Sequence, residues 1–168
     1  RPGEKLDAGD AHVEVIGSPG HTPEHVAFAV TGGGRAPALF SGGSLIVGGA
    51  GRTDLVAPAL TDTLTRQQFR SVVGAFRSLP DDTVLNPTHG AGSFCSTGAG
   101  GQRTSTLGEE RRTNPIFSIP SEDEFARWFP ATFPAAPAYF YRLRPVNQLP
   151  RLEAEIPAPI TLEPLAFQ

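Results

Sequence analysis

Short apolar stretches separated by turns dominate the first half of the chain. Residues 12–16 alternate between β-branched and polar side chains, and residues 26–30 and 38–40 form compact apolar runs. Both patterns are typical of β-strands. Because the connections are short, we expect the three strands to pair in an antiparallel meander.

The apolar period changes from two to between three and four residues after Thr61. The residues that follow this spacing are Phe69, Val72, Val73, Phe76 and Leu79. They form the buried stripe of an amphipathic helix, for which Thr61 or Asp62 is the predicted N-cap and Pro80 the stop.

The second half of the chain alternates between short elements and loops. Residues 83–86 form an apolar run typical of a fourth strand, and His89 follows its end. After a Gly/Ser/Thr-rich loop at 91–106, we expect short helices at 107–112, with a solvated charged face at 109–112, and at 122–129, capped by Ser121. The predicted organisation is a compact region over residues 1–129 and a proline-rich extended linker over 130–168.

Composition narrows the class of protein. The 168 residues are 39% hydrophobic and 18% charged, as in soluble globular proteins, and the net charge of −3 offers no excess of basic residues for nucleic acid. No apolar run approaches the roughly 18 residues of a membrane span. The single Cys95 fits a reducing compartment, so a cytoplasmic protein is expected. Because the chain lacks Met and begins with Arg1, the sequence predicts a fragment or a processed product.

Two of the four histidines follow strand ends. His21 lies in the turn between the first two predicted strands, and His89 follows the fourth. Histidines aimed from rigid turns are common metal ligands, so both are candidates. His25, at the start of the next strand, is interpreted as a packed, hydrogen-bonded residue, and His12 as a surface residue. Cys95 is interpreted as a small residue of a glycine-rich loop.

Several motifs occur in an informative order. They are Gly-His-Thr-Pro-Glu-His at 20–25, Phe-Ser-Gly-Gly-Ser-Leu-Ile-Val-Gly at 40–48, Gly-Arg-Thr-Asp-Leu at 51–55, Leu-Pro-Asp-Asp-Thr at 79–83 and Pro-Thr-His-Gly-Ala-Gly-Ser-Phe-Cys at 87–95. Together they resemble the metallo-β-lactamase fold, and most closely its persulfide dioxygenase and hydroxyacylglutathione hydrolase branch. The tail over 139–147 resembles the segment before a rhodanese domain in fused bacterial members. The implied fold is an α/β (α+β) αββα sandwich, mainly its C-terminal half.

The resemblance implies roles for some residues and departs from the family at others. It makes His21 a metal ligand. It makes His89 a ligand of the second metal in two-metal hydrolases and a usually idle residue in the mono-iron dioxygenases, with Fe(II) or Zn(II) as the family's cofactor. The family's Ser-Gly-Asp ligand turn reads Ser-Gly-Gly, ending at Gly43, and its His-x-His-x-Asp-His loop is absent. Glycine offers no carboxylate, so we predict that this chain by itself is not a competent catalyst.

Three functional hypotheses follow. In the first, the family activity oxidises a low-molecular-weight thiol persulfide with O₂ to sulfite and free thiol. In the second, it is zinc-dependent hydrolysis of a thioester; in the third, the chain is an inactive scaffold or a homo-oligomer interface. Arg52 and Asp54 are predicted either to form a local ion pair or to bind the thiol substrate.

Overall fold

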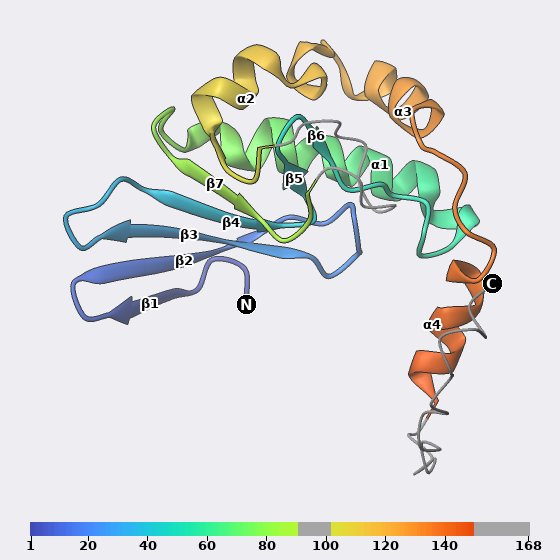
Figure 1. Ribbon diagram of the computed structural model, residues 1–168, viewed down its shortest axis with the longest axis horizontal. Coiled ribbons are helices and arrows are strands. Elements are labelled where there is room, and N and C mark those ends of the chain that lie inside the picture. Colours follow the sequence, from blue (N-terminus) through green and yellow to red (C-terminus); the bar gives the residue numbers. More distant parts are fainter. Residues whose placement is uncertain (91–101, 150–168) are drawn as a thin grey trace, which may run out of the picture. The chain divides into compact units, whose positions relative to one another are not determined.

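The computed structural model describes residues 1–90 and 102–149, in which a six-stranded sheet lies against a layer of helices (Figure 1). The strand order is β1-β2-β3-β4-β7-β8. The strands are β1 Lys5–Ala8, β2 Ala11–Gly17, β3 Val26–Gly32, β4 Ala38–Gly42, β7 Val84–Pro87 and β8 Ser105–Thr106. A separate hairpin joins β5 Leu45–Ile46 to β6 Gly49–Ala50. The mixed α/β class predicted from the sequence is confirmed.

The first four strands form an antiparallel meander, so the predicted pairing of β2, β3 and β4 is also confirmed. Strand β7 then joins β4 in parallel, and β8 closes the edge in antiparallel orientation. Between Phe40 and Gly42 the β4–β7 register shifts by a bulge. This parallel pair brings the carboxyl ends of β4 and β7 together.

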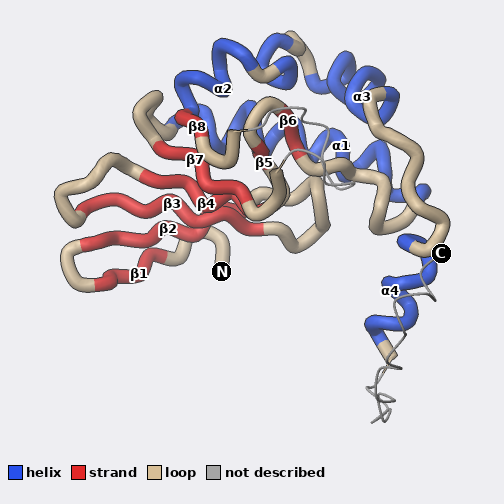
Figure 2. The backbone as a smooth tube through the Cα atoms, viewed as in Figure 1, coloured by secondary structure: helices blue, strands red, loops and turns tan. Residues whose placement is uncertain are grey.

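The helical layer follows the chain in three pieces (Figure 2). The first is one continuous helical stretch made of η1 Pro58–Leu60, α1 Thr61–Phe69, a π-helical segment η2 Arg70–Gly74 and η3 Ala75–Ser78. The second and third are α2 Leu107–Thr113 with η4 Pro115–Ser118, and α3 Glu122–Ala131. The predicted helices are present, and Ser121 caps α3 as expected by accepting from the Glu124 N–H.

The predicted cap of the first helix is wrong. Leu60 occupies the N-cap position and makes no side-chain capping bond, and Thr61 is already helical. The reason is the 3₁₀ turn at Pro58–Leu60, which runs directly into α1. Its backbone supplies the start that a side chain would otherwise provide.

The hydrophobic core lies between the sheet and the helices. Leu39 and Leu85, on the paired strands β4 and β7, are fully buried with Phe76 of η3 and Phe125 of α3. Truncating a phenylalanine in such a core costs roughly 3–5 kcal/mol. These long-range contacts fix the ends of β4 and β7 and so position the turns that follow them.

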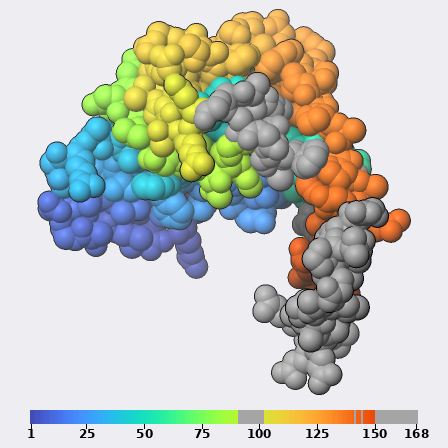
Figure 3. All heavy atoms as spheres, in the orientation of Figure 1, coloured from blue at the N-terminus to red at the C-terminus, as the bar shows by residue number. Residues whose placement is uncertain are grey.

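The opposite face of the sheet is apolar and open within the described residues. Phe28 and Phe40 are cross-strand partners, 41% and 48% exposed, and Leu6 of β1 is 49% exposed. In the space-filling view the strands at the N-terminal end, in blue, lie away from α2 and α3, in yellow and orange (Figure 3). An exposed aromatic pair of this kind favours association.

The charged segment at residues 109–112 departs from prediction. Glu110 is 1% exposed, and its carboxylate accepts from the Gly48 N–H at 2.9 Å and from Asn114 Nδ2 at 2.8 Å. The expected solvated face is therefore wrong at this position. Glu110 instead binds α2 to the β5–β6 hairpin.

The tail is not extended throughout. The chain divides into two compact units, Arg1–Ala136 and Pro137–Gln168, and the second contains helix α4 Phe140–Gln148. Among the helices in the described ranges, none is long and apolar enough to cross a membrane.

Candidate functional site

The turn between β2 and β3 positions His21. Gly20 adopts a φ of +146°, and a Cβ there would lie 2.5 Å from the Cα of Gln68 in α1. The Ser71 hydroxyl donates to the Pro19 carbonyl at 2.7 Å. Glycine at position 20 therefore lets the turn lie directly against the helix, which makes it a rigid support for His21.

The hydrogen bond of His21 defines its tautomer. Its Nδ1 lies 2.8 Å from the carbonyl oxygen of Arg52, which can only accept, so Nδ1 carries the proton. Burial lowers the pKa of His21, the bond to Arg52 opposes this, and the nearby His89 lowers it further. The neutral ring thus keeps a free lone pair on Nε2, as a metal ligand or a general base requires.

His89 lies close to His21. Their ring centroids are 5.8 Å apart with the planes inclined at 75°. The Thr88 N–H donates to the Gly42 carbonyl at 3.0 Å, which fastens the end of β7 to the end of β4. The structure therefore brings the two histidines together; their metal-binding role stays a prediction.

Two glycines form a slot for the His21 ring. A Cβ at Gly43 would lie 2.9 Å from His21 Nε2 and would collide with Cδ2. A Cβ at Gly51 would lie 2.7 Å from Nδ1. The missing side chain at position 43 is thus more than the loss of a carboxylate, because the His21 ring lies against the space that this side chain would need.

His25 is satisfied entirely by protein atoms. The Gly43 N–H donates to its Nε2 at 3.1 Å, so Nδ1 bears the proton and faces the hydroxyls of Ser18, at 2.8 Å, and Ser44, at 3.0 Å. Burial, with a smaller contribution from His21, lowers the pKa of His25 to about 4. The predicted packed, hydrogen-bonded role is confirmed: His25 links the two turns that flank the site.

Three other predicted residues have clear positions. His12 is exposed, as expected, and its Nδ1 lies 2.6 Å from an Asp7 carboxylate oxygen. Arg52 is only 2% exposed and forms a bidentate pair with Asp54, at 2.7 and 2.8 Å. Its guanidinium also lies 5.2 Å from the Phe133 ring centroid. The predicted ion pair is present, and substrate binding by these two residues stays a prediction.

Sequence reasoning missed the parts that hold the site together. Ser44 donates to the Ser18 carbonyl at 2.9 Å, and Gly51 lines the His21 slot. The Gly-Ser-rich composition of residues 41–51 was the available signal, since close backbone approach requires small residues. Cys95 lies outside the described residues.

Known proteins are similar to this chain over about 70% of its length. No model of a known protein family matches the sequence. The chain is 34% identical over 118 residues to an uncharacterised protein of Mycobacterium tuberculosis, covering 69% of this chain and 45% of that protein. It is 30% identical over 121 residues to human mitochondrial persulfide dioxygenase ETHE1, covering 72% and 41%. It is 28% identical over 123 residues to hydroxyacylglutathione hydrolase GloC of Haemophilus influenzae, covering 71% and 47%.

Solved structures agree with these relatives. A metallo-β-lactamase from Staphylococcus aureus superposes with a TM-score of 0.76 at 35% identity, over 88% of this chain and 43% of that one. The chain has the metallo-β-lactamase fold. ETHE1 from Myxococcus xanthus superposes on this metallo-β-lactamase-fold chain with a TM-score of 0.59 at 26% identity, over 90% and 52%. The chain spans about half the length of the relatives it matches.

In the part of this metallo-β-lactamase-fold chain that the structure describes, the donor set by itself does not fit a resident iron or zinc ion. His21 and His89 supply two imidazoles, and position 43 supplies no side-chain oxygen. Across residues 1–90 and 102–149, no cluster of three or more His, Cys, Asp or Glu side chains has a geometry suited to a metal. Structural and catalytic sites use three or four protein ligands, so these two residues are insufficient by themselves.

Proposed function

We propose that the protein containing this chain is a persulfide dioxygenase acting on a low-molecular-weight thiol persulfide. The balanced reaction is RSSH + O₂ + H₂O → RSH + H₂SO₃. The observation that carries this proposal is the His21 turn, in which the Arg52 carbonyl fixes Nδ1–H and leaves Nε2 unprotonated. The similarity to persulfide dioxygenases in both sequence and structure supports it.

We also propose that residues 1–168 alone do not catalyse this reaction. The supporting observation is the two-imidazole donor set, with a glycine at position 43. In the chain itself, His21 and His89 then form part of a site that needs further ligands. The Arg52–Asp54 pair holds the backbone segment that orients His21, because the Arg52 carbonyl is the partner of Nδ1.

Two alternatives have specific support. The 5.8 Å separation of the His21 and His89 rings favours a zinc thioester hydrolase, in which both histidines would bind metal. The position of His21 against Gly43 favours an inactive scaffold, since the ring lies in the way of a side chain there. A hydrolase requires both histidines, a mono-iron dioxygenase depends mainly on His21, and a scaffold requires neither.

The first test is the metal content of the purified 168-residue chain, measured by mass spectrometry without chelator and beside its His21→Ala variant. Negligible iron and zinc in a folded chain is the expected result. Near-stoichiometric metal that is lost with His21→Ala would overturn the proposal that this chain alone holds none.

The second test uses the longest natural form of the protein. Sulfite formation from glutathione persulfide and thiol release from S-lactoylglutathione are measured for the native protein and for His21→Ala and His89→Ala. We expect sulfite formation that His21→Ala abolishes and His89→Ala largely preserves. Thioester hydrolysis lost in both variants would instead establish the hydrolase, and neither activity in the folded protein would establish the scaffold.

A further inference from the structure

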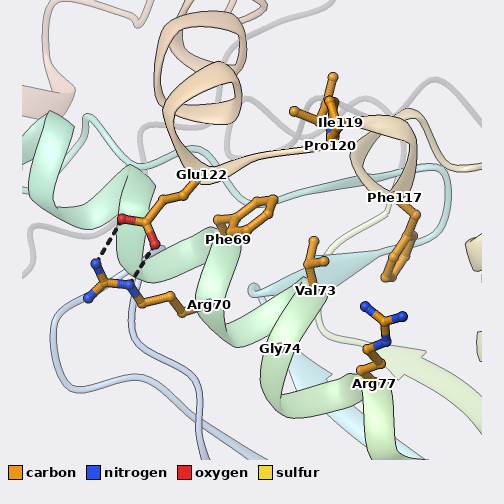
Figure 4. A pocket seen from close by; sticks show the side chains of 9 residues that line it. All are labelled: Phe69, Arg70, Val73, Gly74, Arg77, Phe117, Ile119, Pro120 and Glu122. Atoms are coloured by element: carbon orange, nitrogen blue, oxygen red, sulfur yellow. Dashed lines mark hydrogen bonds and ion pairs between the residues drawn. The ribbon is translucent and has the colours of Figure 1, made fainter.

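A groove on the helical layer has no role in the chemistry described above. It is a hollow of about 580 Å³ between the first helical stretch and the loop that joins η4 to α3 (Figure 4). We call it the Arg77 groove, and its principal lining residues are Phe69, Val73, Gly74, Arg77, Phe117 and Ile119. The lining is therefore apolar apart from Arg77 and the charged pair of Arg70 and Glu122 at one end.

An irregular helical segment shapes the groove. The π-helical turns of η2, Arg70–Gly74, supply Val73 and Gly74 to its lining. Inserted π-turns are uncommon and are frequent at functional sites. Gly74 has φ −93° and ψ −74°, which any residue tolerates, and a Cβ there would meet no atom of the described residues within 4 Å. The backbone therefore does not require glycine at position 74, and its absent side chain leaves the groove open.

The charges around the groove are unequally neutralised. Arg70 is paired with Glu122 through two bonds of 2.7 Å, drawn in Figure 4. Arg111 pairs with Asp81 and donates to three backbone carbonyls. Arg77 is exposed, and no residue of the described ranges forms an ion pair or side-chain hydrogen bond with its guanidinium. Within the described residues, a cation that no side chain pairs with thus lies beside an apolar surface, on a chain whose net charge is −3.

We propose that the Arg77 groove binds a peptide segment of a partner protein in which an acidic side chain neighbours a bulky apolar one. A carboxylate would take two hydrogen bonds from the Arg77 guanidinium, as planar bidentate pairing allows. The adjacent apolar side chain would cover Val73 and Phe117 above the open position at Gly74.

The form of the groove favours a peptide over a small molecule. Every residue that lines it is at least partly exposed. Small-molecule sites enclose most of the ligand surface, whereas a shallow apolar strip with one cation suits a side chain presented from another protein surface.

The test is an NMR titration of the isotope-labelled chain with acetylated, amidated tetrapeptides that pair Glu or Asp with Leu, Ile, Phe or Trp. Each acidic peptide is compared with its Gln or Asn counterpart. We expect chemical-shift changes at the backbone N–H signals of Val73, Gly74 and Phe117. The Gln or Asn peptide should bind roughly 10-fold or more weakly than its acidic counterpart, because a charge-assisted hydrogen bond is lost.

Variants establish the location. Arg77→Gln is expected to weaken binding of the acidic peptide about 10-fold or more, and Gly74→Phe is expected to block its binding sterically. The matched control is Arg112→Gln, since Arg112 is an exposed arginine that pairs with Glu109 and does not line the groove. It should leave the affinity unchanged, and thermal melting verifies that each variant is folded.

Several outcomes would overturn the proposal. They are the absence of groove shifts with every peptide at millimolar concentration, equal affinity for acidic and neutral peptides, or retention of binding in Arg77→Gln. Benzoate binding as tightly as the peptides would make the groove a small-carboxylate site. The same shifts produced by unlabelled copies of this chain would make it a self-association surface.

Discussion

The slot around His21 makes a quantitative prediction about Gly43. In Gly43→Ala the new Cβ would lie 2.9 Å from His21 Nε2, closer than real Cβ atoms come, and at a tight 3.2 Å from Cγ. The ring has little room to retreat, because Gly51 lies against it and Nδ1 is bound to the Arg52 carbonyl. Overpacking of this kind costs about 1–3 kcal/mol, so the free energy of unfolding of Gly43→Ala should be lower by that amount.

The assay is urea unfolding of a double-mutant cycle. If the His21 ring causes the loss of stability, Gly43→Ala should lower the free energy of unfolding by less than about 0.5 kcal/mol when His21 is already alanine. The coupling energy between positions 21 and 43 should then be about 1 kcal/mol or more. Gly74→Ala is the control for replacing a glycine, and it should stabilise the chain by about 0.5–1 kcal/mol, because the position is helical and open. An equal cost of Gly43→Ala with and without the His21 ring would refute the slot.

Three further perturbations probe the surroundings of the site. Since the pKa of His25 is lowered to about 4, its contribution to stability should be complete above pH 6.5 and lost as the pH falls from 6.5 towards 4; His25→Gln should remove this part of the pH profile of urea unfolding. Asp54→Asn should destabilise the chain more than Arg52→Met, by calorimetry, because only the former removes the carboxylate of the bidentate pair while the buried guanidinium stays in place. Replacing Phe28 and Phe40 by Thr should reduce any self-association measured by sedimentation, and unchanged sedimentation of an associating chain would exclude this face.

Strong local patterns explain what the sequence predicts of the fold. Strands β2, β3, β4 and β7 and helices α1, α2 and α3 have apolar spacing or capping residues that are visible without tertiary information. The elements that were missed lack such a pattern. All four residues of β1 are exposed, and β5, β6 and β8 are two residues each, so pairing with a neighbour defines them. The π-helical insertion in η2 likewise has no local sequence signature.

The site shows the same division. His21 and His89 are recognisable as strand-end histidines, whereas their proximity depends on the parallel pairing of β4 with β7. The family resemblance identifies Gly43 as the position of a missing carboxylate. That it also accommodates an imidazole ring depends on where Gly51 and the Arg52 carbonyl lie, and this is a property of the folded chain.

The parallel β4–β7 pair also affects the order in which the chain folds. Strands β1 to β4 pair across short turns, but β4 and β7 meet only after residues 43–83 have closed a long crossover. Closure of that crossover costs conformational entropy before any β4–β7 contact forms to offset it. We therefore expect the meander to form early and the two histidine turns to meet late, so that the neighbourhood of His21 and His89 is assembled last.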